Sequence, residues 1–119
     1  DFTIQCRDGE LKVHKLLLVQ LEYFEVMFGR GWMESQKSEV TFDYDYSVVY
    51  TVMESLYCSA VYHNFSNNNL LQMIRKDILD NAFETRKDHL EQLAQFVSYL
   101  DYNEFYVLFN YLAPMINHN

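Results

Sequence analysis

Residues 1–28, DFTIQCRDGELKVHKLLLVQLEYFEVMF, decide the fold because their apolar period changes once. Up to Val13, apolar and polar residues alternate on both sides of an Asp8-Gly9 turn, which predicts a β-hairpin over residues 2–13. After His14, apolar residues recur at spacings of three and four, which predicts one or two short helices packed on the sheet. These positions are Leu17, Leu18, Leu21, Phe24 and Phe28.

The rest of the chain contains one more strand pattern and then helical patterns only. Residues 38–42 alternate as a third strand, and Ser47 is a candidate cap for a helix that ends near residues 58–60. A polar loop over residues 62–69 precedes a helix over residues 70–79, and Asp88 begins a capping box for the next helix. The last helix follows Asn103 and should stop at Pro114. This order predicts an α+β domain, with a small, mostly three-stranded sheet covered by about five or six helices.

Composition narrows the function. The 119 residues suit one domain, and 50% of them are hydrophobic, enough for a core. Nine Lys and Arg against seventeen Asp and Glu give a net charge of −8, which disfavours nucleic acid as a partner. Apolar runs such as residues 16–19 are too short to span a membrane. Only three Gly and one Pro disfavour an all-β sandwich.

Catalytic and metal-binding patterns are not evident. Cys6 and Cys58 are far apart, which favours reduced thiols in an intracellular, cytoplasmic or nuclear protein. The histidines have no metal-ligand spacing, and residues 29–31 are too short for a phosphate loop. We therefore expect no enzyme activity, no metal and no cofactor.

Several short motifs occur in a characteristic order. The chain opens with DFTI at residues 1–4, continues with VHKLLL at 13–18 and YFEVMF at 23–28, and then has WMES at 32–35 and VTF at 40–42. The helix end VMESLY at residues 52–57 and the run LAQFVSYL at 93–100 extend the likeness over almost the whole chain. In this order they resemble a BTB/POZ domain of the adaptor type, as in BTB-Kelch and MATH-BTB proteins. The resemblance implies one domain over residues 1–119, with an extended insertion at about residues 62–88.

The resemblance implies a homodimer. BTB domains commonly pair through the first strand and the first helices, and an edge strand of a small sheet benefits from a symmetric partner. The alternative is that the same side chains fill the core of the monomer. The candidate contacts are Phe2, Ile4, Leu16, Leu17 and Tyr23.

The resemblance also implies an adaptor that brings a protein substrate to a cullin-3 ubiquitin ligase. Adaptor-type members use a hydrophobic-x-Glu motif after the second helix, and Trp32, Met33 and Glu34 match it. Tyr44 and Tyr46 lie close to this motif in the sequence and are candidate contacts for the amino-terminal region of cullin-3. The alternative is that Trp32 folds back on the core and Glu34 only caps a turn.

Two further interpretations remain open. The same fold could self-associate as a structural or assembly module without cullin, as in a viral or scaffold component. A transcription-regulator dimerisation domain is disfavoured because Gln20 or Leu21 stands near the position of the arginine in that class. The substrate is expected to bind a flanking domain outside this chain. The bias towards Asn, Tyr and Phe suits an AT-rich genome, such as that of a large DNA virus, which would place the protein in a host cell or a virion.

Overall fold

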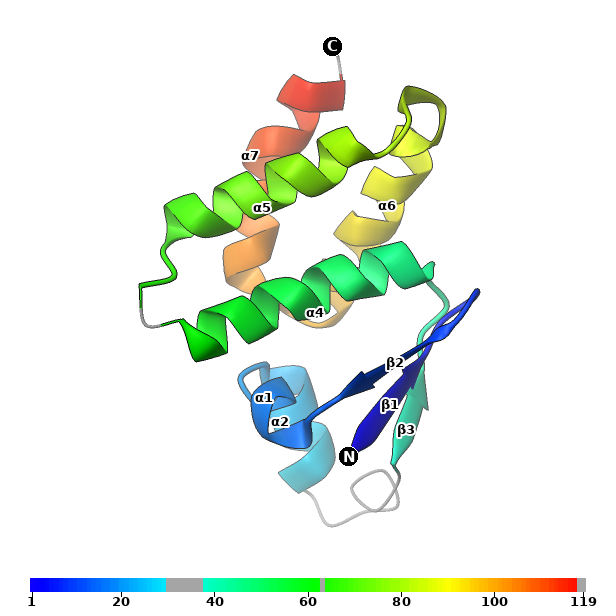
Figure 1. The fold of residues 1–119 in the computed structure, drawn as a ribbon, viewed down its shortest axis with the longest axis vertical. Coiled ribbons are helices and arrows are strands. Elements are labelled where there is room, and N and C mark those ends of the chain that lie inside the picture. Colours follow the sequence, from blue (N-terminus) through cyan, green and yellow to red (C-terminus); the bar gives the residue numbers. More distant parts are fainter. Residues whose placement is uncertain (30–37, 63, 118–119) are drawn as a thin grey trace.

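The structure is a computed structural model that describes residues 1–29, 38–62 and 64–117. It has a three-stranded sheet at one end and a group of helices that fills the rest of the molecule (Figure 1), which confirms the predicted α+β class. The strands are β1 (Phe2–Gln5), β2 (Glu10–Val13) and β3 (Glu39–Thr41). The helices are α1 (Lys15–Leu18), α2 (Glu22–Gly29), α4 (Tyr46–Val61), α5 (Asn67–Asp80), α6 (Phe83–Tyr99) and α7 (Asn103–Asn117).

β1 is the central strand of the sheet, whose order is β2-β1-β3. β1 pairs antiparallel with β2 across the predicted hairpin, with Phe2 opposite Val13, and parallel with β3. Because side chains alternate between the two faces of a strand, Phe2, Ile4 and Val13 point into the core, whereas Thr3 and Gln5 line the polar outer face.

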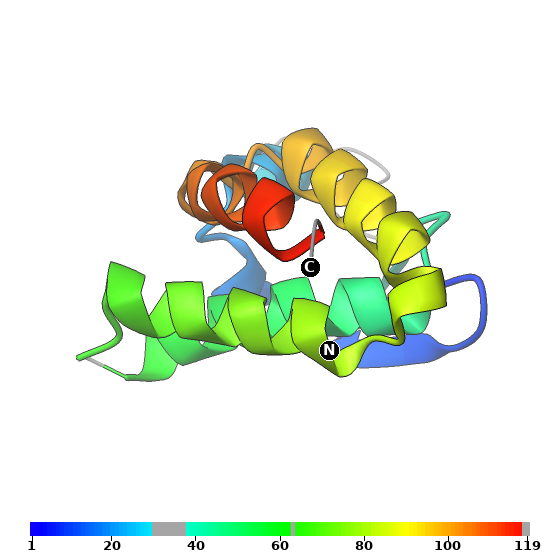
Figure 2. The same ribbon diagram turned by 90° about the horizontal axis from the view of Figure 1, so that it is seen from above.

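The long helices form two layers. α4 and α5 run side by side in Figure 1, and the view from above in Figure 2 shows α6 and α7 as a second layer packed along one side of them. Apolar side chains spaced at three and four residues on each helix meet between the layers, as their periodicity requires. Those fully excluded from solvent include Val52 on α4, Ile74 on α5, Phe96 on α6 and Phe105 on α7.

The polar segment after α4 contains a complete helix, α5. The Ser66 hydroxyl accepts a hydrogen bond from the Asn69 backbone N–H at 3.3 Å, which caps the helix where the polar run ends. Leu70, Ile74 and Ile78 form its buried stripe and pack against α4 and α7. The predicted helix over residues 70–79 is confirmed and starts three residues earlier. Residues 62–88 therefore contribute to the helical core.

Two predicted helix boundaries are wrong. α6 begins at Phe83, five residues before Asp88, and the Asp88 carboxylate accepts a hydrogen bond from the Gln92 amide instead of capping the helix. α7 continues through Pro114 to Asn117. The proline removes the bond to the carbonyl of Asn110, which lies on the exposed side where water can replace it, and buried Ile116 anchors the last turn.

α4 begins at Tyr46, with Asp45 rather than Ser47 at the N-cap position. Asp45 makes no side-chain cap bond, because its carboxylate accepts from the Gln92 amide at 3.0 Å. The Asp45 backbone N–H donates to the side-chain Oε1 of Gln92 at 2.8 Å. The start of α4 is thus fixed by a contact with α6.

Candidate partner-binding surfaces

A groove of about 300 Å³ lies between the β3–α4 connection and α6. We call it the Tyr44 groove. It combines aromatic rings with an exposed ion pair, a mixture typical of the anchor sites in protein interfaces. Its lining residues are Arg7, Thr41, Phe42, Asp43, Tyr44, Gln95 and Tyr99.

Buried aromatic rings form the floor of the Tyr44 groove. Phe42 follows β3, and its ring centroid lies 5.0 Å from that of Phe96. The ring centroid of Tyr44 also lies 5.0 Å from that of Phe96. Tyr99, at the end of α6, packs on Tyr23 of α2 at 5.1 Å, and their hydroxyls are 3.2 Å apart. Because α6 fixes Phe96 and α2 fixes Tyr23, the groove is bounded by rigid elements.

Tyr99 presents the largest exposed aromatic surface of the groove, with 56% of the residue accessible. Burial raises the pKa of Tyr44, and nearby Tyr99 and Asp43 add to the shift. The pKa of Tyr23 is also raised, first by burial and then by its hydrogen bond with Tyr99. The two hydroxyls therefore stay neutral at physiological pH and act as hydrogen-bonding groups rather than as bases.

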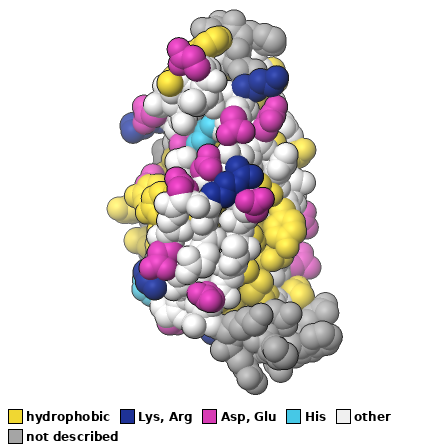
Figure 3. Space-filling view, turned by 90° about the vertical axis from the view of Figure 1, so that its right-hand side faces the viewer, with side chains coloured by type: hydrophobic (Ala, Val, Ile, Leu, Met, Phe, Trp, Pro, Cys, Tyr) yellow, Lys and Arg dark blue, Asp and Glu magenta, His cyan; other side chains and the backbone are white. Residues whose placement is uncertain are grey.

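The rim of the groove carries an ion pair. The Arg7 Nε donates to the Asp43 Oδ1 at 2.8 Å, and Arg7 Nη1 lies 3.8 Å from Asp45. This hydrogen bond lowers the pKa of Asp43 and raises that of Arg7. Basic side chains lie among acidic ones on the face shown in Figure 3. Both partners are exposed, so the pair adds little to stability and is available to a binding partner.

The sequence-predicted cullin contacts are only partly described. Trp32, Met33 and Glu34 lie outside the described residues. Tyr44 is half-buried and lines the groove. Tyr46 is not among the lining residues; its ring stacks on Tyr50 at 5.9 Å, on α4.

Sequence reasoning missed Arg7, Gln95 and Tyr99. Gln95 and Tyr99 are four residues apart, so they share one face of α6, and neither belongs to its buried stripe. That spacing was a readable signal for an outward-facing pair. No local pattern connects either residue with Arg7, which reaches the groove through the sheet.

The five candidate dimer residues divide into two groups. Phe2 and Ile4 are buried in the central strand, where β2 and β3 already pair with the β1 backbone. Covering an exposed edge is therefore no reason for a partner at β1. Leu17 and Tyr23 are half-buried, whereas Leu16 on α1 is 81% exposed. Leu16 is thus the candidate whose side chain is open to a second protein.

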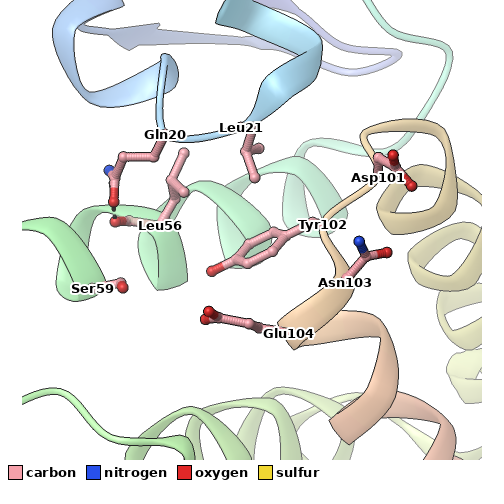
Figure 4. A pocket seen from close by; sticks show the side chains of 8 residues that line it. All are labelled: Gln20, Leu21, Leu56, Ser59, Asp101, Tyr102, Asn103 and Glu104. Carbon is pink, nitrogen blue, oxygen red and sulfur yellow. Dashed lines mark hydrogen bonds between the residues drawn. The ribbon is translucent and has the colours of Figure 1, made fainter.

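A second pocket, of about 260 Å³, lies where the α1–α2 connection, α4 and the start of α7 meet (Figure 4). The side chains of Tyr102 and Glu104 point towards Ser59, and Gln20 donates to the Leu56 carbonyl at 3.5 Å. Tyr102 is buried, which raises its pKa. Asp101 precedes it with a φ of 58°, a left-handed turn that lets α7 fold back on α6.

Among the described residues, the most buried polar cluster does not have the geometry of a nucleophile and base. The Asp77 carboxylate accepts from Thr51 Oγ1 at 2.7 Å and contacts His89 Nε2 at 2.6 Å, so the hydroxyl and the imidazole both meet the carboxylate rather than each other. Burial raises the pKa of the Cys6 and Cys58 thiols, which keeps them protonated.

The part of the chain that the structure describes holds no group of three or more His, Cys, Asp or Glu placed to bind a metal ion. No helix there is both long and apolar enough to cross a membrane.

Comparison with known proteins identifies one family. The model of the BTB/POZ domain family matches residues 1–93, from β1 into α6. The match includes the sheet, α4, α5 and the segment over residues 62–88. A search of curated proteins finds none that matches the chain.

Proposed function

We propose, because the chain belongs to the BTB/POZ domain family, that this protein-protein interaction module forms a homodimer and recruits the amino-terminal region of cullin-3. A protein held by a flanking domain would then become the substrate of the ligase. Ubiquitin transfer would be the work of the ligase, and the present chain would supply binding surfaces only. The domain boundary at residues 1–119 remains part of this proposal.

The Tyr44 groove is the observation that carries cullin recruitment. Its volume of about 300 Å³ is at the lower end of ligand pockets and suits one or two anchor side chains of a protein. The exposed Tyr99 ring offers apolar area, and the Arg7–Asp43 pair offers both a donor and an acceptor at the rim. Aromatic anchors beside oriented polar groups are the usual composition of interface hot spots.

Tyr99→Ala is expected to weaken binding of the cullin-3 amino-terminal region by about tenfold or more, because an interface hot spot contributes at least about 2 kcal/mol. Calorimetric titration measures the affinity. Tyr111→Ala on α7 is the matched control, since Tyr111 is 62% exposed and the same atoms are removed. Trp32→Ala and Glu34→Lys test the predicted motif in the same assay. An unmutated domain that does not bind at about 100 μM, a weak affinity, removes the adaptor proposal.

Leu16→Asp is expected to remove pairing through α1, and so to weaken self-association, while leaving the fold intact. A charge at an exposed apolar contact cannot be desolvated without cost, and a residue 81% exposed contributes little to the monomer core. Sedimentation velocity at several concentrations measures the association. Leu79→Asp on α5, where the leucine is also exposed, is the control. A dimer of unchanged affinity in Leu16→Asp would contradict pairing through α1.

Self-association without cullin is the second candidate function. No described strand pairs with the outer edge of β2, which favours this candidate because that edge gives the chain another surface for copies of itself. Binding of the cullin-3 region by the unmutated domain separates the two candidates.

A further inference from the structure

β2 is an edge strand whose outward backbone groups can be identified. The odd-numbered residues Thr3, Gln5 and Arg7 form backbone hydrogen bonds with the segment that contains β3. The Thr3 N–H donates to the Ser38 carbonyl, and the Arg7 N–H donates to the Tyr44 carbonyl. The Gln5 carbonyl accepts from the Phe42 N–H. The Cys6 N–H instead bonds the Gly9 carbonyl at 2.8 Å, across the hairpin. In an antiparallel pair, bonded positions recur every second residue. The backbone N–H and C=O groups of the even-numbered residues of β1 therefore point towards β2.

The register then settles which β2 residues face outward. Ile4 opposes Leu11 and Phe2 opposes Val13, so Leu11 and Val13 bond β1. The backbone N–H and C=O groups of Glu10 and Lys12 consequently point away from the sheet. The next outward donor, the His14 N–H, is bonded by the Tyr57 hydroxyl at 2.7 Å. The outward donor of His14 is thus satisfied within the chain, whereas those of Glu10 and Lys12 have no bond among the described residues.

An apolar groove of about 250 Å³ runs beside this edge, between β2 and α4. Its lining is mostly apolar: Leu11, Lys12 and Val13 form the strand side, and Tyr50, Met53, Glu54 and Tyr57 form the helix side. Tyr50 is 45% exposed. A strand added to β2 would place every second side chain over this groove, as in recognition by strand addition. The open edge and the apolar groove therefore favour the same kind of occupant.

The edge is complementary to itself. If a second copy of β2 runs antiparallel and Leu11 opposes Leu11 of the second copy, then Glu10 opposes Lys12 of the second copy and Lys12 opposes Glu10. In this register the outward groups of Glu10 and Lys12 fall at hydrogen-bonding positions, while the two leucines fall at the closer, non-bonded position over the groove. Opposite charges directly across a strand pair are favourable, and both side chains are exposed.

We propose that β2 is a self-association edge, at which two copies pair antiparallel about Leu11 and join their sheets into one continuous sheet. The occupant of the groove is then the Leu11 side chain of the second copy. This contact uses neither α1 nor the Tyr44 groove. It goes beyond the homodimer proposed above, because a chain with two self-complementary surfaces can form an open row of copies.

Sedimentation velocity of the Leu16→Asp variant tests the proposal without the α1 contact. We expect concentration-dependent association that salt weakens, since the paired charges are exposed. Lys12→Glu should weaken it by about tenfold, because each molecule loses attraction and gains repulsion at both charge pairs. The exchanged variant Glu10→Lys/Lys12→Glu should restore association to within about twofold of the parent, because the same pairs re-form in reverse. Failure of this restoration overturns the register about Leu11.

Lys12→Pro tests the backbone contribution. It deletes one outward N–H but no bond to β1, and proline is tolerated on an edge strand with its nitrogen outward. It should abolish association, whereas Lys12→Ala, which keeps the N–H, should only weaken it. Equal thermal melts of the two variants by circular dichroism confirm that both fold. A Leu16→Asp protein that stays monomeric up to about 500 μM, far above a weak dissociation constant, overturns the β2 proposal. If the unmutated and Leu16→Asp proteins associate equally and Lys12→Pro does not associate, the β2 proposal is supported and the α1 dimer is overturned.

Discussion

Phe96→Ala should lower the free energy of unfolding by about 3–5 kcal/mol, the usual loss for removing a buried phenylalanine. Phe96 is fully excluded from solvent, and the rings of Phe42 and Tyr44 each lie 5.0 Å from it. Substitution removes both aromatic contacts and leaves a cavity between the sheet and α6. Rings held by two different elements can close such a cavity only in part, so the loss should fall in the upper half of this range.

Urea unfolding followed by circular dichroism measures the change, with an unchanged slope showing that the same surface is exposed. Phe83→Ala is the matched control, since it makes the same substitution on the same helix. Phe83 is 62% exposed, and the Arg86 guanidinium lies 5.6 Å from its ring, so its loss should cost at most about 1 kcal/mol. If the two variants were equally stable, the aromatic floor of the Tyr44 groove would not be a packed core. The folded Phe96→Ala protein should also bind cullin more weakly.

The fold was predictable wherever the local spacing of apolar residues determines which face of a strand or helix is buried. The change of period at His14 was enough to predict β1, β2 and the short helices after them, because an alternating segment can bury only one face of a sheet. Boundary predictions failed where a tertiary contact overrides a local preference. The Gln92 side-chain amide donates to the carboxylates of Asp45 and Asp88, so neither caps a helix. The burial of Ile116 stabilises a last turn of α7 beyond Pro114.

The candidate surfaces were harder to predict, because core and interface residues have the same composition. Phe2 and Ile4 are apolar residues of the first strand, as a dimer contact would be, yet both lie on the core-facing side of the sheet, and pairing with β3 makes β1 the central strand. That parallel pairing joins Thr3 to Glu39 and leaves no trace in the local period. It also places β2 at one edge of the described sheet and β3 at the other. The Tyr44 groove likewise depends on β3, which brings Arg7 and Asp43 together.

Asp77→Ala should lower the free energy of unfolding by about 2–6 kcal/mol, because it leaves the buried Thr51 hydroxyl and His89 imidazole without their acceptor, and each unsatisfied group costs about 1–3 kcal/mol. The carboxylate lies 2.6 Å from His89 and 2.7 Å from the Thr51 hydroxyl, so one side chain of α5 satisfies α6 and α4 together. His89 is only 4% exposed and cannot turn to water without opening the helical layers. The histidine looked isolated in the sequence because its partner, Asp77, comes from another helix, α5.

Variants of the same network should lose free energy of unfolding by amounts that follow a fixed order. Asp77→Asn keeps one acceptor oxygen and the volume, and should cost about 1–3 kcal/mol, the loss for an incompletely satisfied buried group. Thr51→Val removes a single hydrogen bond and should cost about 1 kcal/mol. Asp80→Ala on the same helix breaks only the exposed pair with Lys76 and should cost less than about 0.5 kcal/mol.

The comparison of Asp77→Ala with Asp80→Ala decides whether the network joins the helices. Both substitutions remove an aspartate from α5, and urea unfolding measures both against the same parent. Equal losses would mean that the carboxylate of Asp77 is no more important than a surface charge. A large loss in Asp77→Ala alone would show that residues 67–80 are bound to α4 and α6 by polar contacts as well as by their apolar stripe. Because α5 also packs on α7, the last helix should then loosen with it, which amide hydrogen exchange along α7 would detect.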